Sequence, residues 1–108
     1  MEKNKRIKEL NDSFRTTFCG GRVMLTQVVQ ALAPINQAKL LELVKAFDTF
    51  SQDNDPHAEH DFGAMDLEGE RYFWKIDYYD QLLERGSEDP SNPDITMRVM
   101  TIMLAEEY

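Results

Sequence analysis

The feature that most constrains the fold is a pair of strand-forming runs joined by Glu68-Gly69. The runs 60–67 and 70–79 are rich in aromatic and alternating residues, which is typical of β-strands. A two-residue connection that ends in glycine favours a tight turn, because glycine adopts positive φ without steric cost. The sequence therefore predicts a β-hairpin over about 60–79.

A two-residue turn also fixes the strand register, and the register predicts which side chains are neighbours. Gly63 is expected opposite Trp74, where the missing side chain leaves room for the ring to lie across the backbone. His60 is expected opposite Asp77. The other predicted pairs are Met65 with Tyr72, Asp66 with Arg71, Ala64 with Phe73, and Phe62 with Lys75.

The two faces of this hairpin differ in polarity. The more apolar face is expected to pack on helices, and it carries Met65, Leu67, Tyr72, Trp74, Ile76 and Tyr78. The opposite face still carries Phe62, Phe73 and Tyr79. A face that is half apolar is expected to be covered by another element or by a partner.

The rest of the chain predicts helices and one short strand. Apolar spacing predicts helices over about 4–18, 35–48 and 95–106, and a strand over about 22–25. Residues 26–33 fit a short helix or a longer strand, and periodicity does not decide between them. The sequence therefore predicts a single α+β domain over 1–108, with a small antiparallel sheet packed against helices.

Charge is unevenly distributed along the chain, whose formal net charge is −8. Residues 1–47 carry eight Lys or Arg against four Asp or Glu, whereas 48–94 carry three against fourteen. An acidic second half argues against direct nucleic-acid binding, which requires neutralisation of phosphates. It favours a basic or nucleic-acid-binding protein as partner, while solubility alone remains the simpler interpretation.

The N-terminus and the cysteine content bear on location. Residues 1–10 are charged and lack the apolar core of a secretory signal, and no apolar stretch is long enough to cross a bilayer. Cys19 is the single cysteine, so an internal disulfide is excluded. A cytoplasmic protein without a membrane partner is expected.

Both histidines lie among carboxylates in the stretch 53–61, and these are ligand types that zinc or manganese would accept. Such a metal site would use Asp55, His57, His60 and Asp61, and acid–base chemistry would use Glu59, His60 and Asp77. The competing interpretation is structural. In it, His60 contacts Asp77 across the hairpin, Asp53 and Asp55 cap turns, and no cofactor is bound.

Four segments together resemble a known family: LNDSFRTTF-x-GGRVMLT (10–26), DNDPHAEHDFGA (53–64), YFWKIDYYD (72–80) and TIMLAEEY (101–108). The chain resembles an uncharacterised bacterial domain-of-unknown-function family, number three-seven-six-eight. The resemblance implies a small single-domain bacterial protein of the alphaproteobacterial type, often carried on plasmids and other mobile elements. It implies no activity and no catalytic residue.

Three functions remain open on these observations. The first is an acidic interaction protein of mobile-element type that modulates a host defence or nucleic-acid-handling protein. Its expected partner surface consists of Asp53, Asp55, Glu59, Asp66, Phe73 and Tyr79. The second is a metal-dependent hydrolase that uses the histidine and carboxylate cluster, so enzymatic activity stays undecided. The third is a module that forms a homodimer through the spare sheet face.

Overall fold

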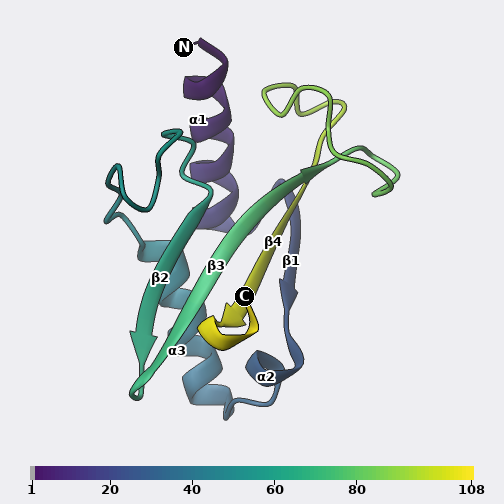
Figure 1. Ribbon diagram of the computed structural model, residues 1–108. Helices are drawn as coiled ribbons and strands as arrows, with labels where there is room; N and C mark the ends of the chain where they lie inside the picture. The colour runs from purple at the N-terminus through teal and green to yellow at the C-terminus, as the bar shows by residue number, and fades with distance from the viewer. Residues whose placement is uncertain (1) are drawn as a thin grey trace.

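The computed structural model describes residues 2–108 and shows an α+β fold, as expected (Figure 1). The elements in chain order are α1 (Glu2–Thr17), β1 (Gly21–Leu25), α2 (Gln27–Gln30), α3 (Pro34–Ala46), β2 (Phe62–Leu67), β3 (Glu70–Tyr79), β4 (Met97–Leu104) and a final 3₁₀ turn η1 (Ala105–Glu107). None of the helices in this range has the length and apolar content needed to cross a bilayer.

The sheet has four strands in the order β1-β4-β3-β2. β3 is antiparallel to both of its neighbours, β2 and β4, but β1 runs parallel to β4, so the expectation of a purely antiparallel sheet is wrong. A parallel pair needs a long connection. Here α2, α3 and the whole hairpin separate β1 from β4, which satisfies that requirement.

The predicted helix over 95–106 is wrong, because this segment forms β4 between β3 and β1. Its side chains alternate across the sheet: Met100 and Ile102 are fully buried on the helix side, and Val99 and Thr101 are half-buried on the other. A central strand with apolar side chains on both faces reads as a nearly continuous apolar run. That run also fits helical spacing, which explains the error.

The hairpin forms as predicted. Every predicted pair from Phe62↔Lys75 to Asp66↔Arg71 is present, including Gly63 opposite Trp74. Glu68 and Gly69 have φ values of 51° and 80°, the positive φ that a twisted two-residue turn requires. The first strand of the hairpin is Phe62–Leu67, so it begins two residues after the expected start at residue 60.

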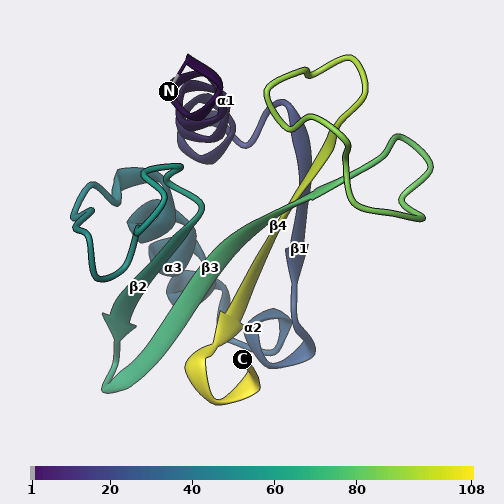
Figure 2. The same cartoon turned by 45° about the horizontal axis from the view of Figure 1, so that its top comes forward.

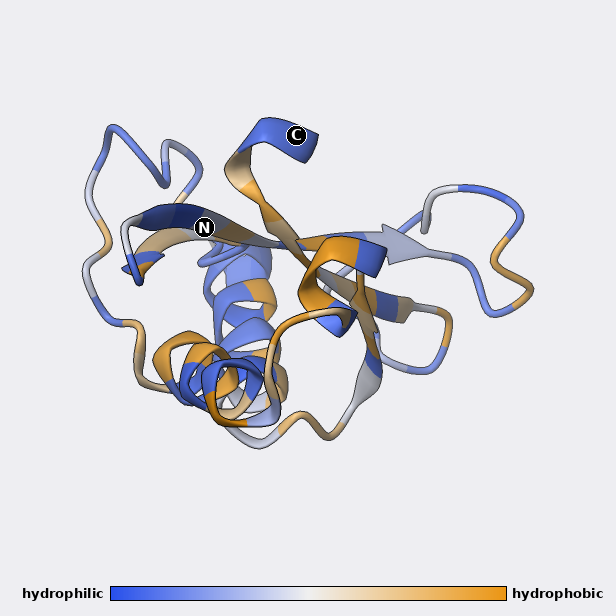
Figure 3. Cartoon of the chain, turned by 90° about the horizontal axis from the view of Figure 1, so that it is seen from below, coloured by the Kyte–Doolittle hydropathy of each residue, from blue (hydrophilic) through white to orange (hydrophobic). Residues whose placement is uncertain are grey.

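Helices cover one face of this sheet. Figure 3 shows α1 and α3 on one side and the C-terminal turn on the other. The core contains the inner hairpin residues Met65, Tyr72, Trp74 and Ile76, as predicted. On α3, apolar spacing in the sequence predicts that Leu40, Leu43 and Val44 are buried. Leu40 and Val44 are buried, but Leu43 is 38% exposed, because it lies beside the open edge of β2.

Residues 27–30 form a short helix, with Thr26 as its N-cap, so the helical alternative for 26–33 is the right one. The sheet face opposite the helices is partly covered by the C-terminal residue. The ring centroid of Tyr108 lies 5.7 Å from that of Phe62 and 5.6 Å from that of Phe73. Residues 80–96 form the long connection at the end of the sheet opposite the hairpin turn (Figure 2).

Candidate functional site

The acidic segment after α3 folds as a loop organised by its own side chains. Asp55 is buried, and its Oδ1 accepts hydrogen bonds from the backbone N–H groups of Glu59 (3.0 Å) and His60 (3.1 Å). Asn54 accepts from the Ser51 N–H and donates to the Thr49 carbonyl. Asp55 therefore stabilises a turn as predicted.

His60 lies between two carboxylates, but neither of them is Asp77. Its Nδ1 is 2.8 Å from Asp12 Oδ1 on α1, and its Nε2 is 3.7 Å from Asp55 Oδ2. The imidazole ring stacks on the Phe50 ring, with 3.6 Å between the two ring centroids. The predicted His60–Asp77 contact is wrong, since His60 has φ of 56° and leaves the extended backbone before the ladder begins. Asp77 pairs instead with Lys75 at 2.7 Å.

Arg15 extends this cluster from α1 to α3. Its Nη2 donates to the same Asp12 oxygen at 3.1 Å, and its Nη1 donates to the Val44 and Lys45 carbonyls at 3.3 Å. These carbonyls belong to the last turn of α3, where a cation is favourable. The guanidinium also lies 5.2 Å from the Trp74 ring centroid. The cluster therefore ties α1, α3 and the acidic loop together.

A second buried polar cluster links α1 to the sheet. Asn11 is fully buried; it accepts from Arg98 Nε at 2.7 Å and donates to Tyr78 Oη at 2.8 Å and to the Glu59 carbonyl. The Tyr78 hydroxyl donates to Glu59 Oε1 at 2.8 Å. Burial raises the pKa of Tyr78 and lowers the pKa of Arg98.

Sequence reasoning missed four members of these clusters: Asn11, Asp12, Arg15 and Arg98. A usable signal existed for Asn11, because it lies four residues after Ile7 on the buried face of α1. A polar residue on such a stripe must find a partner inside the protein. No comparable local signal marks Arg98, whose strand was taken for a helix.

The predicted metal ligands do not converge. His57 is exposed, and its carbonyl accepts a hydrogen bond from Asn4, while His60 and Asp55 face each other inside the loop. Glu59 is engaged by Tyr78. Across residues 2–108, no group of three or more His, Cys, Asp or Glu side chains is placed to hold a metal ion. The contacts of these residues attach the acidic loop to α1 and to the sheet.

Asp61 offers a test of the electrostatics of this loop. Burial, with the nearby Glu59 and Asp55 carboxylates, raises the pKa of Asp61 above its ordinary value of 3.8. The folded state then binds the proton more tightly than the unfolded chain, so stability falls as pH rises through this window. Asp61→Asn is expected to raise Tm by roughly 3 °C at pH 7.

The gain should shrink as the pH falls through the titration of the Asp61 carboxyl, because the folded wild type then takes up a proton at this group. Thermal unfolding followed by circular dichroism between pH 4 and 8 measures this difference. Asp53→Asn, at an exposed position in the same loop, is the control and should leave Tm unchanged. A lower Tm for Asp61→Asn at pH 7, or a gain that does not vary with pH, would contradict the assignment.

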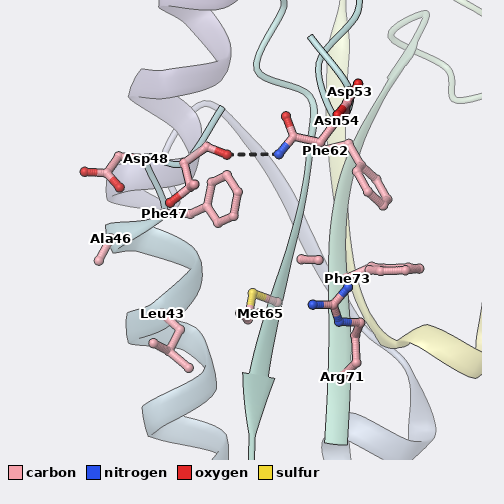
Figure 4. A pocket seen from close by; sticks show the side chains of 12 residues that line it. Leu43, Ala46, Phe47, Asp48, Asp53, Asn54, Phe62, Met65, Arg71 and Phe73 are labelled. Carbon is pink, nitrogen blue, oxygen red and sulfur yellow. Dashed lines mark hydrogen bonds between the residues drawn. The ribbon is translucent and has the colours of Figure 1, made fainter. Parts of the chain in front are cut away.

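A groove runs between α3 and β2, and we call it the α3–β2 groove. Its first part is a hollow of about 700 Å³ near the end of α3 (Figure 4). Leu43 and Ala46 line one wall, β2 and β3 residues line the other, and Asp53 and Asn54 lie at the rim. A second hollow of about 540 Å³ shares Leu43 and Ala46 and continues along α3 to Ile35.

Exposed carboxylates lie along this groove and at the hairpin turn, and the basic residues Lys39 and Arg71 also line the groove. Residues 48–70 contain no Lys or Arg, and their exposed acidic side chains are Asp48, Asp53, Asp66, Glu68 and Glu70. Of the expected partner surface, Asp53 and Phe73 line the first hollow, and Tyr79 lies at a smaller hollow beside Arg22 and Met24. Asp55 is 7% exposed and is therefore not available to a partner.

Comparison with known proteins gives one family match. A family model described as "Protein of unknown function (DUF3768)" matches residues 25–107. The chain belongs to the DUF3768 family. No curated protein and no solved structure matches it.

The DUF3768 match covers some features of this site and not others. All residues that line the α3–β2 groove, from Ile35 to Phe73, lie inside the matched range. The α1 residues that hold the loop, Asn11, Asp12 and Arg15, lie before it. The groove is therefore built from the DUF3768 region itself.

Proposed function

We propose that this DUF3768 protein is an acidic interaction module that binds a basic protein. The observation that carries this proposal is the set of five exposed carboxylates in residues 48–70, a stretch without Lys or Arg: two of them line the first hollow of the α3–β2 groove, and three lie at or beside the hairpin turn. Lys39 and Arg71 also line the groove, but the carboxylates outnumber them, and an excess of one sign attracts and orients a partner of the opposite sign.

The partner class follows from the same chemistry. Proteins that bind DNA or RNA present Lys and Arg to the phosphate backbone, so they carry the complementary surface. The proposal therefore names a nucleic-acid-handling protein as partner, with a host defence protein as one member of that class and a mobile element as the origin of the chain. No contact among residues 2–108 favours the alternative of a metal-dependent hydrolase.

Neutralising the groove carboxylates is expected to abolish partner binding. The groove variant Asp53→Asn/Glu68→Gln/Glu70→Gln removes three exposed charges whose side chains form no hydrogen bond or ion pair within residues 2–108. The control variant Glu84→Gln/Glu88→Gln/Asp94→Asn changes net charge equally in the distant 80–96 connection. Immobilised wild type and both variants are incubated with a lysate of the encoding organism, and retained proteins are identified by mass spectrometry.

The wild type and the control variant should retain a basic protein. The groove variant should retain at least about tenfold less of it. Raising salt from about 50 to 300 mM should release it, because exposed charges are screened. Equal retention by both variants, or retention that ignores salt, would refute the proposal.

A further inference from the structure

We infer that β2 is a docking edge at which an extended basic segment of the partner adds to the sheet as a fifth strand. This inference rests on the proposed function and specifies how the partner is held. Strand addition obtains affinity from main-chain hydrogen bonds and specificity from alternate side chains.

The backbone of β2 has free hydrogen-bonding groups. β2 ends the strand order, so only β3 pairs with it. The Ile76 N–H donates to the Asp61 carbonyl at 2.8 Å, which marks 61 and 76 as a hydrogen-bonded pair. In an antiparallel ladder such pairs alternate, so the N–H and C=O groups of Phe62, Ala64 and Asp66 point to the open edge. Among residues 2–108 these three make no backbone hydrogen bond outside the hairpin.

The α3–β2 groove lies directly beneath this edge. A strand added to β2 would turn every second side chain toward α3, where the inner-face residues of β2 also pack. Two large apolar side chains of α3 are exposed to solvent there: Ile35 is 63% exposed and Leu43 is 38% exposed. Inward side chains of the docked segment would bury both, so these positions should be apolar.

The remaining side chains of an added strand would lie on the outer face beside acidic groups. Asp66 is on that face of β2, where Arg71 pairs with it at 3.2 Å. Glu68 and Glu70 are at the turn, and Asp48 and Asp53 are at the other end of the groove. Lys or Arg at these outward positions would be opposite charges at close range. The fitting occupant is a segment in which apolar and basic residues alternate.

Charge also selects against a second copy of the same chain. Two β2 edges related by a two-fold axis pair antiparallel, so Asp66, Glu68 and Glu70 of one copy would approach the end of the other copy at which Asp48 and Asp53 lie, which is unfavourable. β2 also lacks the proline, lysine or bulge with which natural edge strands avoid pairing. The acidic groups therefore keep identical copies apart and leave the edge open to a basic strand.

The test uses a fluorescent eight-residue peptide of alternating lysine and valine, with blocked ends, at about 150 mM salt. Two further versions carry N-methyl groups on either the lysines or the valines, because a strand directs the N–H groups of alternate residues to opposite sides. A fourth has the same composition as a block of lysines followed by a block of valines. Anisotropy gives the affinities, and amide exchange by NMR locates the bound peptide.

Strand addition predicts that the alternating peptide binds and slows amide exchange at Phe62, Ala64 and Asp66. N-methylation of one alternate set, but not the other, should weaken binding at least about tenfold, and the block peptide should also bind weakly. Equal affinity for all four peptides would overturn the inference while leaving the proposed charge-based function intact. Failure of the alternating peptide to bind would overturn the inference as well.

A protein variant tests the groove separately from charge. Ile35→Ser/Leu43→Ser changes only exposed apolar side chains and should fold normally, which circular dichroism checks. It should bind the alternating peptide about tenfold more weakly. Leu82→Ser/Ile95→Ser is the matched control at exposed positions outside the groove and should bind as the wild type does. Unchanged binding by the groove variant would contradict the predicted burial of these side chains.

Discussion

Gly63→Ala is expected to lower Tm by about 10 °C, and Gly63→Val to lower it further. A Cβ at position 63 would overlap the Nε1 atom of Trp74 and lie 2.7 Å from its Cε2. It would also lie 2.9 Å from Cζ of Phe47. Trp74 is fully buried, so the ring has no free space to enter, and overpacking of this kind costs roughly 3 kcal/mol.

Trp74 is the single tryptophan, so its fluorescence during urea unfolding reports directly on this contact. Gly86→Ala is the control, because the nearest atom to its added Cβ is 3.8 Å away. That variant should unfold at the wild-type urea concentration. Wild-type stability of Gly63→Ala would show that the ring does not lie across the β2 backbone.

Asn11→Leu is expected to reduce the free energy of unfolding by about 2–4 kcal/mol. The change removes the Oδ1 that accepts from Arg98 and the amide that donates to Tyr78 and to the Glu59 carbonyl. Arg98 is 2% exposed, and its remaining partner is the Pro90 carbonyl. A buried charge that loses its acceptor cannot recover the loss from water.

A double-mutant cycle separates this polar contact from packing. Arg98→Met is expected to cost a similar amount alone, since it leaves Asn11 Oδ1 buried without a donor. Combined with Asn11→Leu, it removes both partners, so the double variant should be less destabilised than the two single losses added together. Urea unfolding of the four proteins measures the coupling. Strict additivity would show that Asn11 and Arg98 do not interact.

The hairpin could be predicted because its determinants are local. Glu68-Gly69 sets the turn, the turn sets the register, and the register places Gly63 against Trp74. Each step involves residues close in sequence, and the structure confirms each one. The same reasoning predicted which face of the hairpin would enter the core.

The strand β4 could not be predicted in this way, because its identity depends on distant partners. Met97–Leu104 lies between β3 and β1, and β1 is more than 70 residues earlier in the chain. Apolar side chains lie on both faces of the segment, which removes the alternation of apolar and polar residues that usually marks a strand in the sequence. Only knowledge of the whole sheet distinguishes it from a buried helix.

In the candidate site too, local features could be predicted from the sequence and contacts between distant residues could not. The acidic stretch was visible in the sequence, and Asp55 was correctly expected to stabilise a turn. The partner of His60 was not visible, because Asp12 lies 48 positions earlier on α1. The α3–β2 groove was also hidden, since it depends on the exposure of Leu43 on a helix whose apolar stripe was expected to be buried.

Hydrogen–deuterium exchange of the free protein and of its complex with the captured basic protein most directly tests whether the acidic edge is the binding surface. The partner should slow exchange in Phe62–Leu67 and in the Pro34–Ala46 helix and leave exchange in α1 unchanged. Slower exchange confined to α1 or to Gly21–Leu25, at the opposite edge of the sheet, would contradict this prediction.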